Sequence, residues 1–413
     1  MPAIPALNRK TITDYLTITS GVLGRLVISL VYFLIVANVL TLAEFGIFAS
    51  ASAVGLVVSR LMAFGFISPV YRVATVKPRL LGAYTAGLVV LALLSLPLVF
   101  AVAGITHALV FDGRISLALF LVIIASEVLG WRVTEYVVIM LNGLSRFGRS
   151  AALVIVGSTL RTLAAIVFLL TPWRGLEAWI GLYTLANGLT LLIALVVFAP
   201  KLRLRLVWKL YPRRMRDALT AAGSELTFYV QSELDKLLVL SLAGATTAGL
   251  YAIAMRLIDL TAVPIRSFNQ MLVQHLMKDG GAIADWQRRI GLESAIAALS
   301  TLGMMAFIVL LWLHPRALGG NVAGVAPYLL PMLAIPALRN LVEYQGELLY
   351  ARERVLTRVL LLAGLAMLKL GLMAVLLMQF RDFDLWVLPL TGVFVVLYLV
   401  SSTVTYRALA SSR

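Results

Sequence analysis

The chain of 413 residues is strongly apolar and strongly basic. Hydrophobic residues make up 61% of it and charged residues only 13%, whereas soluble domains carry about 25% charged residues. The net charge is +16, and cysteine is absent. This composition excludes a soluble globular protein, and the lack of cysteine excludes disulfides, thiolate metal sites and cysteine nucleophiles. We expect an integral membrane protein.

Twelve apolar segments are long enough to cross a bilayer, which takes about 20 residues per helix. The first, which follows Arg9 and Lys10, is too long for a signal peptide and has no small-residue cleavage site after it, so we expect it to remain in the protein. The expected spans are 15–40, 46–67, 80–104, 115–141, 150–171, 178–199, 217–241, 248–275, 290–313, 325–350, 357–380 and 385–406.

Lysine and arginine are distributed unequally between the two ends of these spans. If the N-terminus is inside, the outer segments hold only Arg114, Arg174, Arg316 and Arg381, and most of the other basic residues are on the inner side. Cytoplasmic loops carry this excess of positive charge. The pattern predicts a multi-pass membrane protein with both termini in the cytoplasm, and the family resemblance given below implies a bacterial cytoplasmic (inner) membrane. It gives no indication of nucleic acid as a partner.

A basic stretch from Lys201 to Arg216 divides six spans from six. We therefore expect an all-α protein with an N-terminal six-helix bundle (1–200), a basic cytoplasmic linker (201–216) and a C-terminal six-helix bundle (217–413). Gly46 and Gly249 stand in similar Gly-apolar-aromatic-Ala turns, which indicates two halves related by a pseudo-twofold axis along the membrane normal. The linker's charge satisfies the orientation rule and attracts anionic lipid headgroups.

Nine basic residues fall within the expected spans: Arg25, Arg60, Arg132, Arg161, Lys236, Arg256, Arg266, Arg339 and Lys369. Charges at this depth are costly, and they face a cavity or a partner. Because guanidinium groups bind phosphate bidentately, we predict a cationic cavity for an anionic substrate. Its candidate residues are Arg25, Arg60, Arg161, Arg256, Arg266, Arg339 and Lys369. Internal ion pairing is the alternative.

Helical spacing supports ion pairing for some of these residues, since side chains three or four apart lie on one face. The possible pairs are Arg132–Glu135, Arg256–Asp259 and Arg339–Glu343, whereas Arg25, Arg60, Arg161 and Lys369 have no acid at such a spacing. Lys236, next to Asp235, is expected to extend toward the outer surface. The candidates for ion coupling or ion pairing are Glu127, Arg132, Glu135, Asp259 and Glu343. No metal site and no catalytic residue is predicted.

Three short elements resemble a known family. They are Ala43-Glu44-Phe45-Gly46-Ile47-Phe48, then Leu234-Asp235-Lys236-Leu237-Leu238-Val239 followed by Ala248-Gly249-Leu250-Tyr251-Ala252, and the stretch from Glu347 to Glu353. Together they resemble the Wzx-type polysaccharide-unit flippases of the multidrug/oligosaccharidyl-lipid/polysaccharide exporter superfamily.

This resemblance implies a MATE-like exporter fold with two six-helix bundles around a central cavity. It further implies that an undecaprenyl-diphosphate-linked oligosaccharide is moved from the inner to the outer leaflet by alternating access, for surface polysaccharide biosynthesis. The expected partners are this lipid-linked glycan, membrane lipids, and the polysaccharide polymerase and chain-length machinery. No cofactor is expected, although a proton or sodium gradient is a candidate driving force.

The main alternative is a multidrug or cation antiporter of the same superfamily, whose cavity should be rich in acids and aromatic residues. A membrane glycosyltransferase is a further alternative, but it would need acids in a large outer loop, and no expected loop is long enough. The short loops also leave no room for a nucleotide-binding domain, and no phosphate-binding Gly-x-x-x-x-Gly-Lys-[Ser/Thr] motif is present. We therefore expect a transporter without an ATPase of its own rather than an enzyme.

Overall fold

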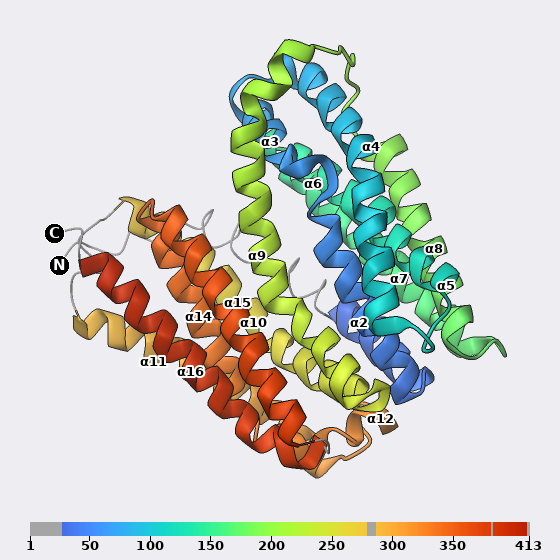
Figure 1. Cartoon of the computed structure of the whole chain (residues 1–413), viewed down its shortest axis with the longest axis vertical. Helices are drawn as coiled ribbons and strands as arrows, with labels where there is room; N and C mark the ends of the chain where they lie inside the picture. The colour runs from blue at the N-terminus through green and yellow to red at the C-terminus, as the bar shows by residue number, and fades with distance from the viewer. Residues whose placement is uncertain (1–26, 279–285, 381–382, 411–413) are drawn as a thin grey trace, which may run out of the picture.

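The structure, a computed structural model, describes residues 27–278, 286–380 and 383–410. This part of the chain consists of helices joined by short turns (Figure 1). The first half begins with a helix over Val27–Val39. It continues with α2 (Leu42–Ser59), α3 (Ile67–Val76), α4 (Leu81–Thr106), α5 (Leu117–Ala125), α6 (Arg132–Gly143), α7 (Phe147–Leu170) and α8 (Leu176–Ile193). The π-helical turns η3 (His107–Phe111), η4 (Ser126–Trp131) and η5 (Ala194–Phe198) extend or join some of these helices.

The second half contains three long helices in sequence, α9 (Tyr211–Ala243), α10 (Ala245–Lys278) and α11 (Trp286–Leu313). Two short helices, α12 (Gly320–Ala323) and α13 (Ala326–Leu329), lead into α14 (Ile335–Ala351), α15 (Val355–Gln379) and α16 (Phe383–Ala410). The helix α9 begins inside the range expected to be linker, because residues 208–210 form a short 3₁₀ turn (η6, Trp208–Leu210) that runs directly into it.

Eight helices in the described ranges are long and apolar enough to cross a membrane. The helix Val27–Val39 is apolar but shorter. The other three expected spans correspond to α9, α10 and α14, which carry more charged residues. These helices complete the set of twelve segments and establish an all-helical, multi-pass membrane fold.

The two halves form a V (Figure 1). The helices α2 to α8 make one arm and α10 to α16 the other, and the arms meet at the end where α12 lies. They diverge toward the end that contains the start of α9 and the last turn of α16, which is the end expected to face the cytoplasm. The helix α9 lies between the arms and contacts α2 and α3 as well as α10 and α15.

The two arms meet at a symmetric glycine contact between α2 and α10, at the end that is expected to face outward and is called the outer end below. A Cβ atom on Gly46 would lie 2.2 Å from the carbonyl oxygen of Ala245, and one on Gly249 would lie 2.0 Å from that of Leu42. Gly46 therefore packs against Ala245, the first residue of α10, and Gly249 packs against Leu42, the first residue of α2. This reciprocal contact is what a twofold relationship between the halves produces, and it explains the sequence echo around the two glycines.

Two asparagines add a second contact at the same end. The Asn321 side-chain amide, on α12, donates to the carbonyl oxygens of Ala37 (2.7 Å) and Leu40 (2.8 Å). The Asn38 side-chain amide donates to the carbonyl oxygen of Leu318 (2.8 Å), and Asn38 Oδ1 accepts from the Asn321 backbone N–H (3.0 Å). The two halves are therefore held together at the outer end.

Two expected spans are interrupted. The span at 46–67 breaks after α2, where Ala63 and Phe64 have positive φ angles of 55° and 50° and the N–H of Ala63 donates to Ser95 Oγ (2.9 Å). Close packing of Gly65 on the backbone of Ala218 in α9 accompanies this break. The span at 325–350 breaks between α13 and α14, where Pro331 lacks a backbone N–H donor, and Pro336 stands in the first turn of α14, where proline is tolerated.

Candidate functional site

A cavity of about 190 Å³ lies between the two halves. Its wall comes from the helix Val27–Val39, α2, α9 and α10, so both arms of the V contribute to it. One side is aromatic and the other is charged. The lining aromatic residues are Tyr32, Phe33, Phe45 and Phe48, and the lining charged residues are Glu233, Lys236, Arg256 and Asp259.

The charged side of this cavity is mostly paired. Lys236 Nζ lies 2.5 Å from a carboxylate oxygen of Glu233, which is one turn earlier on α9. Lys236 thus lines the cavity and does not extend toward the outer surface as the sequence led us to expect. Arg256 differs from Lys236, because its guanidinium donates to the hydroxyl of Ser29 (2.7 Å) and no ion pair joins it to an acid among the described residues.

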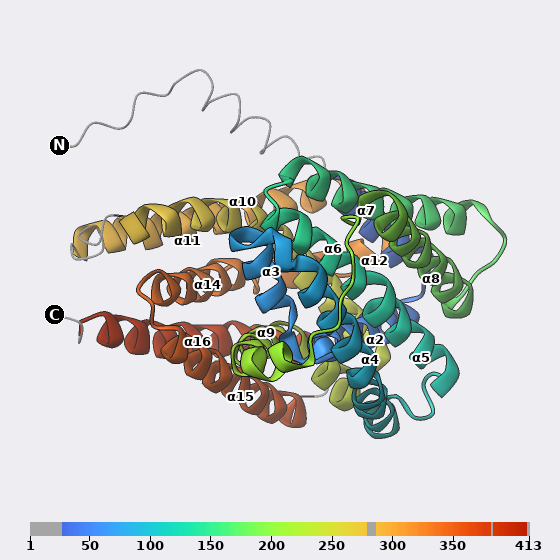
Figure 2. The ribbon, with the colours of Figure 1, turned by 90° about the horizontal axis from the view of Figure 1, so that it is seen from above.

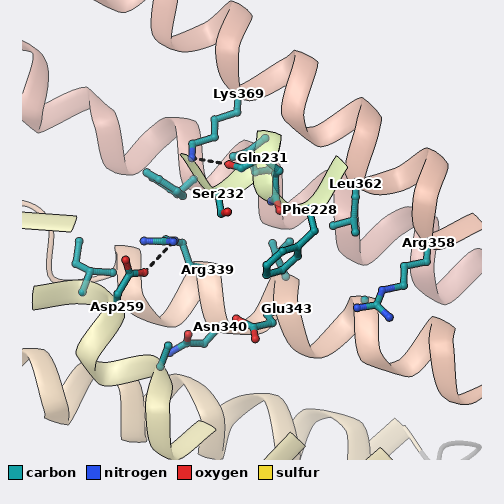
Figure 3. A pocket seen from close by; sticks show the side chains of 16 residues that line it. Phe228, Gln231, Ser232, Asp259, Arg339, Asn340, Glu343, Arg358, Leu362 and Lys369 are labelled. Carbon is teal, nitrogen blue, oxygen red and sulfur yellow. Dashed lines mark hydrogen bonds and ion pairs between the residues drawn. The ribbon is translucent and has the colours of Figure 1, made fainter. Parts of the chain in front are cut away.

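A second cavity, of about 60 Å³, lies inside the second half among α9, α10, α14, α15 and α16 (Figure 3). Asp259 lines both cavities and therefore forms part of the wall between them. Arg339 of α14 points at Asp259 across this smaller cavity and forms an ion pair at 3.0 Å (Figure 3). Its volume is enough for a few water molecules and too small for a sugar.

Beside the smaller cavity, Lys369 of α15 is paired with a buried acid on α9. Its ammonium lies 2.5 Å from Asp235 Oδ2 and 3.0 Å from the carbonyl oxygen of Gln231. The Tyr251 hydroxyl donates to the same carboxylate oxygen at 2.7 Å. The Asp235 and Lys369 side chains are only 1% and 4% exposed, so each charge depends on the other for its stabilisation.

A third charged group lies in the first half at the end of α2, where Arg60 and Arg132 share two glutamates. Arg60 Nη1 lies 2.9 Å from Glu135, and Arg132 lies 2.8 Å from Glu135 and 2.7 Å from Glu225. Arg60 also stacks on the ring of Tyr229 at 4.0 Å. Glu225 and Tyr229 belong to α9, so this group joins the first helix of the second half to the first half.

Glu127 is buried near the aromatic side of the central cavity and is only 2% exposed. Its Oε1 accepts hydrogen bonds from Ser52 Oγ and from the Tyr183 hydroxyl, each at 2.6 Å. It lies in η4, a π-helical turn, and such turns occur often at functional sites. Arg161 stacks on Trp131 of the same turn at 4.4 Å.

In the structure, most of the predicted charged residues have partners other than those that the sequence spacing indicated. Arg132 pairs with Glu135 at the expected spacing. Arg339, expected to pair with Glu343, pairs with Asp259, and Arg256, expected to pair with Asp259, bonds to Ser29. Arg60 and Lys369 have no acid at helical spacing, but both pair with acids of other helices. Glu343 lines the smaller cavity. Arg25 and the side chain of Arg266 lie outside the described residues.

Several residues of these groups were missed by the sequence reasoning. Glu225, Tyr229 and Ser29 supply contacts to predicted arginines, yet none was singled out. Glu225 carried a detectable signal, because it is an acid within an expected span and such acids face a partner or a cavity. Tyr229 and Ser29 carried none, since both residue types are common in membrane helices.

Comparisons with known proteins identify the fold. No protein-family model matches the sequence, and no curated protein matches it. Among solved structures, an inward-facing multidrug resistance MATE family transporter of the MOP superfamily aligns with a TM-score of 0.63 and 13% identity. The alignment covers 94% of this chain and 95% of that one. The outward-facing conformation of such a transporter aligns with a TM-score of 0.56 and 14% identity, over 95% and 96% of the two chains.

A third solved structure has the same fold, a MOP superfamily transporter from Pyrococcus furiosus. It aligns with a TM-score of 0.55 and 13% identity over 94% of this chain and 93% of that one. Its binding pocket is described as having reversed polarity, which suggests a different function for that protein. The chain therefore has the MATE transporter fold, as the sequence predicted.

Proposed function

We propose that this protein is an alternating-access transporter that moves an undecaprenyl-diphosphate-linked oligosaccharide from the cytoplasmic to the outer leaflet. The fold supports a transporter, because the cavity between the halves is lined by both arms and the arms meet at one end only. The short family-like elements of the sequence support this substrate class. The proposal places the glycan and diphosphate in the central cavity and the lipid tail in the bilayer between the arms.

The observation that carries the choice of an anionic substrate is the contact made by Arg256. A hydroxyl group does not neutralise a guanidinium, so the charge of Arg256 is available to a phosphate in the central cavity. A phosphate bound by guanidinium would form charge-assisted hydrogen bonds, which are about twice as strong as neutral ones. Desolvating a diphosphate in the bilayer without such a partner is prohibitive. Arg161 stacks on the ring of Trp131 in the first half and also has no ion pair among the described residues, but it does not line this cavity.

The test is genetic and chemical together. The gene is deleted in its host and restored as wild type, Arg256→Ala or Arg256→Lys, with the exposed Arg213→Ala as a matched charge control. Lipid extracts are then analysed for undecaprenyl-diphosphate oligosaccharides. We expect accumulation in the deletion strain and in Arg256→Ala, with little in the control and an intermediate level in Arg256→Lys. Protein levels are measured by blotting in each strain.

A second candidate function, a multidrug or cation antiporter, is favoured by one observation. The central cavity combines four aromatic residues with Glu233 and Asp259, and aromatic faces attract organic cations. The same strains distinguish the two functions. A deletion strain with no accumulated lipid-linked glycan and with raised sensitivity to a cationic dye would overturn the flippase proposal and support the antiporter.

A further inference from the structure

An apolar cleft of about 420 Å³ opens on the first half, away from the central cavity. Residues 85–96 of α4 form one wall, and residues 129–140 of η4 and α6 form the other. Leu202 and Leu204 of the linker contribute at the inner end. Leu93 and Leu204 are 63% and 58% exposed, and in a membrane-spanning fold such apolar exposure faces lipid. None of the described residues of the second half lines this cleft.

The segment that covers the inner end of the cleft alternates basic and apolar residues. Lys201, Arg203 and Arg205 are exposed and alternate with Leu202, Leu204 and Leu206. The leucines at 202 and 204 line the cleft, so the basic residues stand at its rim. The following Trp208 is 63% exposed, as is typical of tryptophan at the boundary between hydrocarbon and water.

This linker is packed against α4 at defined points. A Cβ atom on Gly82 would lie 2.2 Å from the carbonyl oxygen of Arg203, so only glycine permits the contact. The Tyr211 hydroxyl accepts from the N–H of Val207 (3.0 Å) and donates to the carbonyl oxygen of Ala83 (3.1 Å). Figure 2 shows the linker as an extended trace that runs across the molecule to the start of α9. The basic residues are therefore held in place beside the cleft.

The chain segments around the linker contain many basic residues and very few acidic ones. Between residues 142 and 216 the only acid in the sequence is Glu177, which lies in the first turn of α8, at the opposite end of that helix. Arg149 adds a further cation here, because its guanidinium donates to the carbonyl oxygen of Val197 (2.6 Å). The next acid along the chain, Asp217, pairs with Arg214. Because basic residues predominate here, the site has the charge to bind an anion.

We propose that the cleft and the linker together bind one anionic phospholipid of the adjoining leaflet. An acyl chain lies in the apolar cleft, and the phosphate lies against Lys201, Arg203 and Arg205. A polyprenyl phosphate has the same combination of chain and phosphate. The position favours a resident phospholipid, since the site belongs to one half alone and is separate from the cavity that both halves line. The proposal does not depend on which substrate is transported.

The test measures lipid binding to the purified full chain by native mass spectrometry, with phosphatidylglycerol and phosphatidylcholine titrated separately in mild detergent. The variant Lys201→Gln/Arg203→Gln/Arg205→Gln removes the cations at the rim. The control Lys209→Gln/Arg213→Gln/Arg216→Gln removes the same charge from exposed positions a few residues later. Each surface cation contributes roughly fivefold to the binding of an anionic lipid. We expect phosphatidylglycerol affinity to fall about a hundredfold in the first variant, with little change in the control.

Leu93→Trp, which fills the cleft, provides a second, independent variant. It should weaken binding of both lipids, because it competes with the acyl chain and leaves the cations intact. Three results would overturn the proposal. They are no preference for phosphatidylglycerol in the wild type, equal losses in the two triple variants, or tight binding of undecaprenyl phosphate that phosphatidylglycerol does not displace. The last result would identify a substrate site in place of a phospholipid site.

Discussion

Gly46 of α2 and Gly249 of α10 lie directly against each other's helices at the outer end of the protein. The Cβ positions of both glycines are occupied by backbone atoms of the opposite half, at 2.2 and 2.0 Å. Backbone cannot move aside as the end of a flexible side chain can. The contact therefore exists only while the outer ends are together, and it provides a way to test whether the halves separate there.

We expect Gly249→Ala to favour opening at the outer end. The added methyl group overlaps the backbone of Leu42. Overpacking of this kind costs about 1–3 kcal/mol, which corresponds to an increase of about 5- to 160-fold in the ratio of open to closed molecules. The absence of cysteine allows a single Ala49→Cys, in the central cavity, to be labelled with a membrane-impermeant maleimide from the outside.

Gly181→Ala is the matched control, because no atom lies within 4 Å of its Cβ position. Its labelling rate should equal that of the parent. Equal rates in Gly249→Ala and Gly181→Ala would contradict the prediction that the glycine contact restrains the outer end.

Asn38 and Asn321 are expected to act as one unit at this end. Each contributes hydrogen bonds to the other half, and each such bond contributes about 1 kcal/mol. Asn38→Ala, Asn321→Ala and the double variant form a cycle, measured with the same maleimide assay. We expect each single variant to label faster and the double variant to label little faster than either one, since residues in one network are not additive. Additive effects would indicate two independent contacts.

The Asp235–Lys369 pair is expected to dominate the stability of the second half. Lys369→Met leaves a carboxylate buried without its partner, and breaking a buried pair in this way costs about 3–5 kcal/mol. Asp235→Asn combined with Lys369→Met should recover most of the loss, because neither charge is then left unpaired. The measurement is thermal unfolding of the purified protein in detergent.

A surface pair provides the control for this experiment. Arg214 and Asp217 lie 3.5 Å apart with side chains 46% and 54% exposed, and exposed pairs contribute little. Asp217→Asn should therefore leave the unfolding temperature almost unchanged. If Lys369→Met had as small an effect, the buried pair would not have the structural role that its geometry indicates.

The sequence was sufficient for those parts of the molecule that depend on local spacing or on composition. The apolar segments and the echo around Gly46 and Gly249 predicted the helices and the two-part fold. The ion pair of Arg132 with Glu135 followed from its i,i+3 spacing. Even so, the echo predicted only duplication. It did not predict that each glycine contacts the helix of the other half, because this depends on how the halves pack.

Most of the charge pairing could not be predicted from the sequence. Lys369 and Asp235 are 134 residues apart. Arg60 pairs with Glu225 because α9, which carries Glu225, packs against both halves. Such pairs depend on the rotation and depth of each helix, which one sequence does not fix. For the same reason the candidate list treated Arg60 and Lys369 as available to a substrate, although both have acidic partners in the structure. Among the predicted cavity arginines whose side chains are described, Arg256 and Arg161 are the two whose contacts are neutral groups.

The distance along the chain between Asp235 and Lys369 also has a consequence for synthesis. A charged residue within a helix that enters the membrane raises the cost of inserting that helix, by about 2.5–3.5 kcal/mol at the helix centre and less toward its ends. The helix α9 carries Asp235 without its partner Lys369 until α15 has been made, 134 residues later. During that interval α9 is poorly suited to leave the translocon for lipid on its own. The polar helices of the second half must therefore be retained near the insertion machinery and released together, so that biogenesis of this half is a late, collective event.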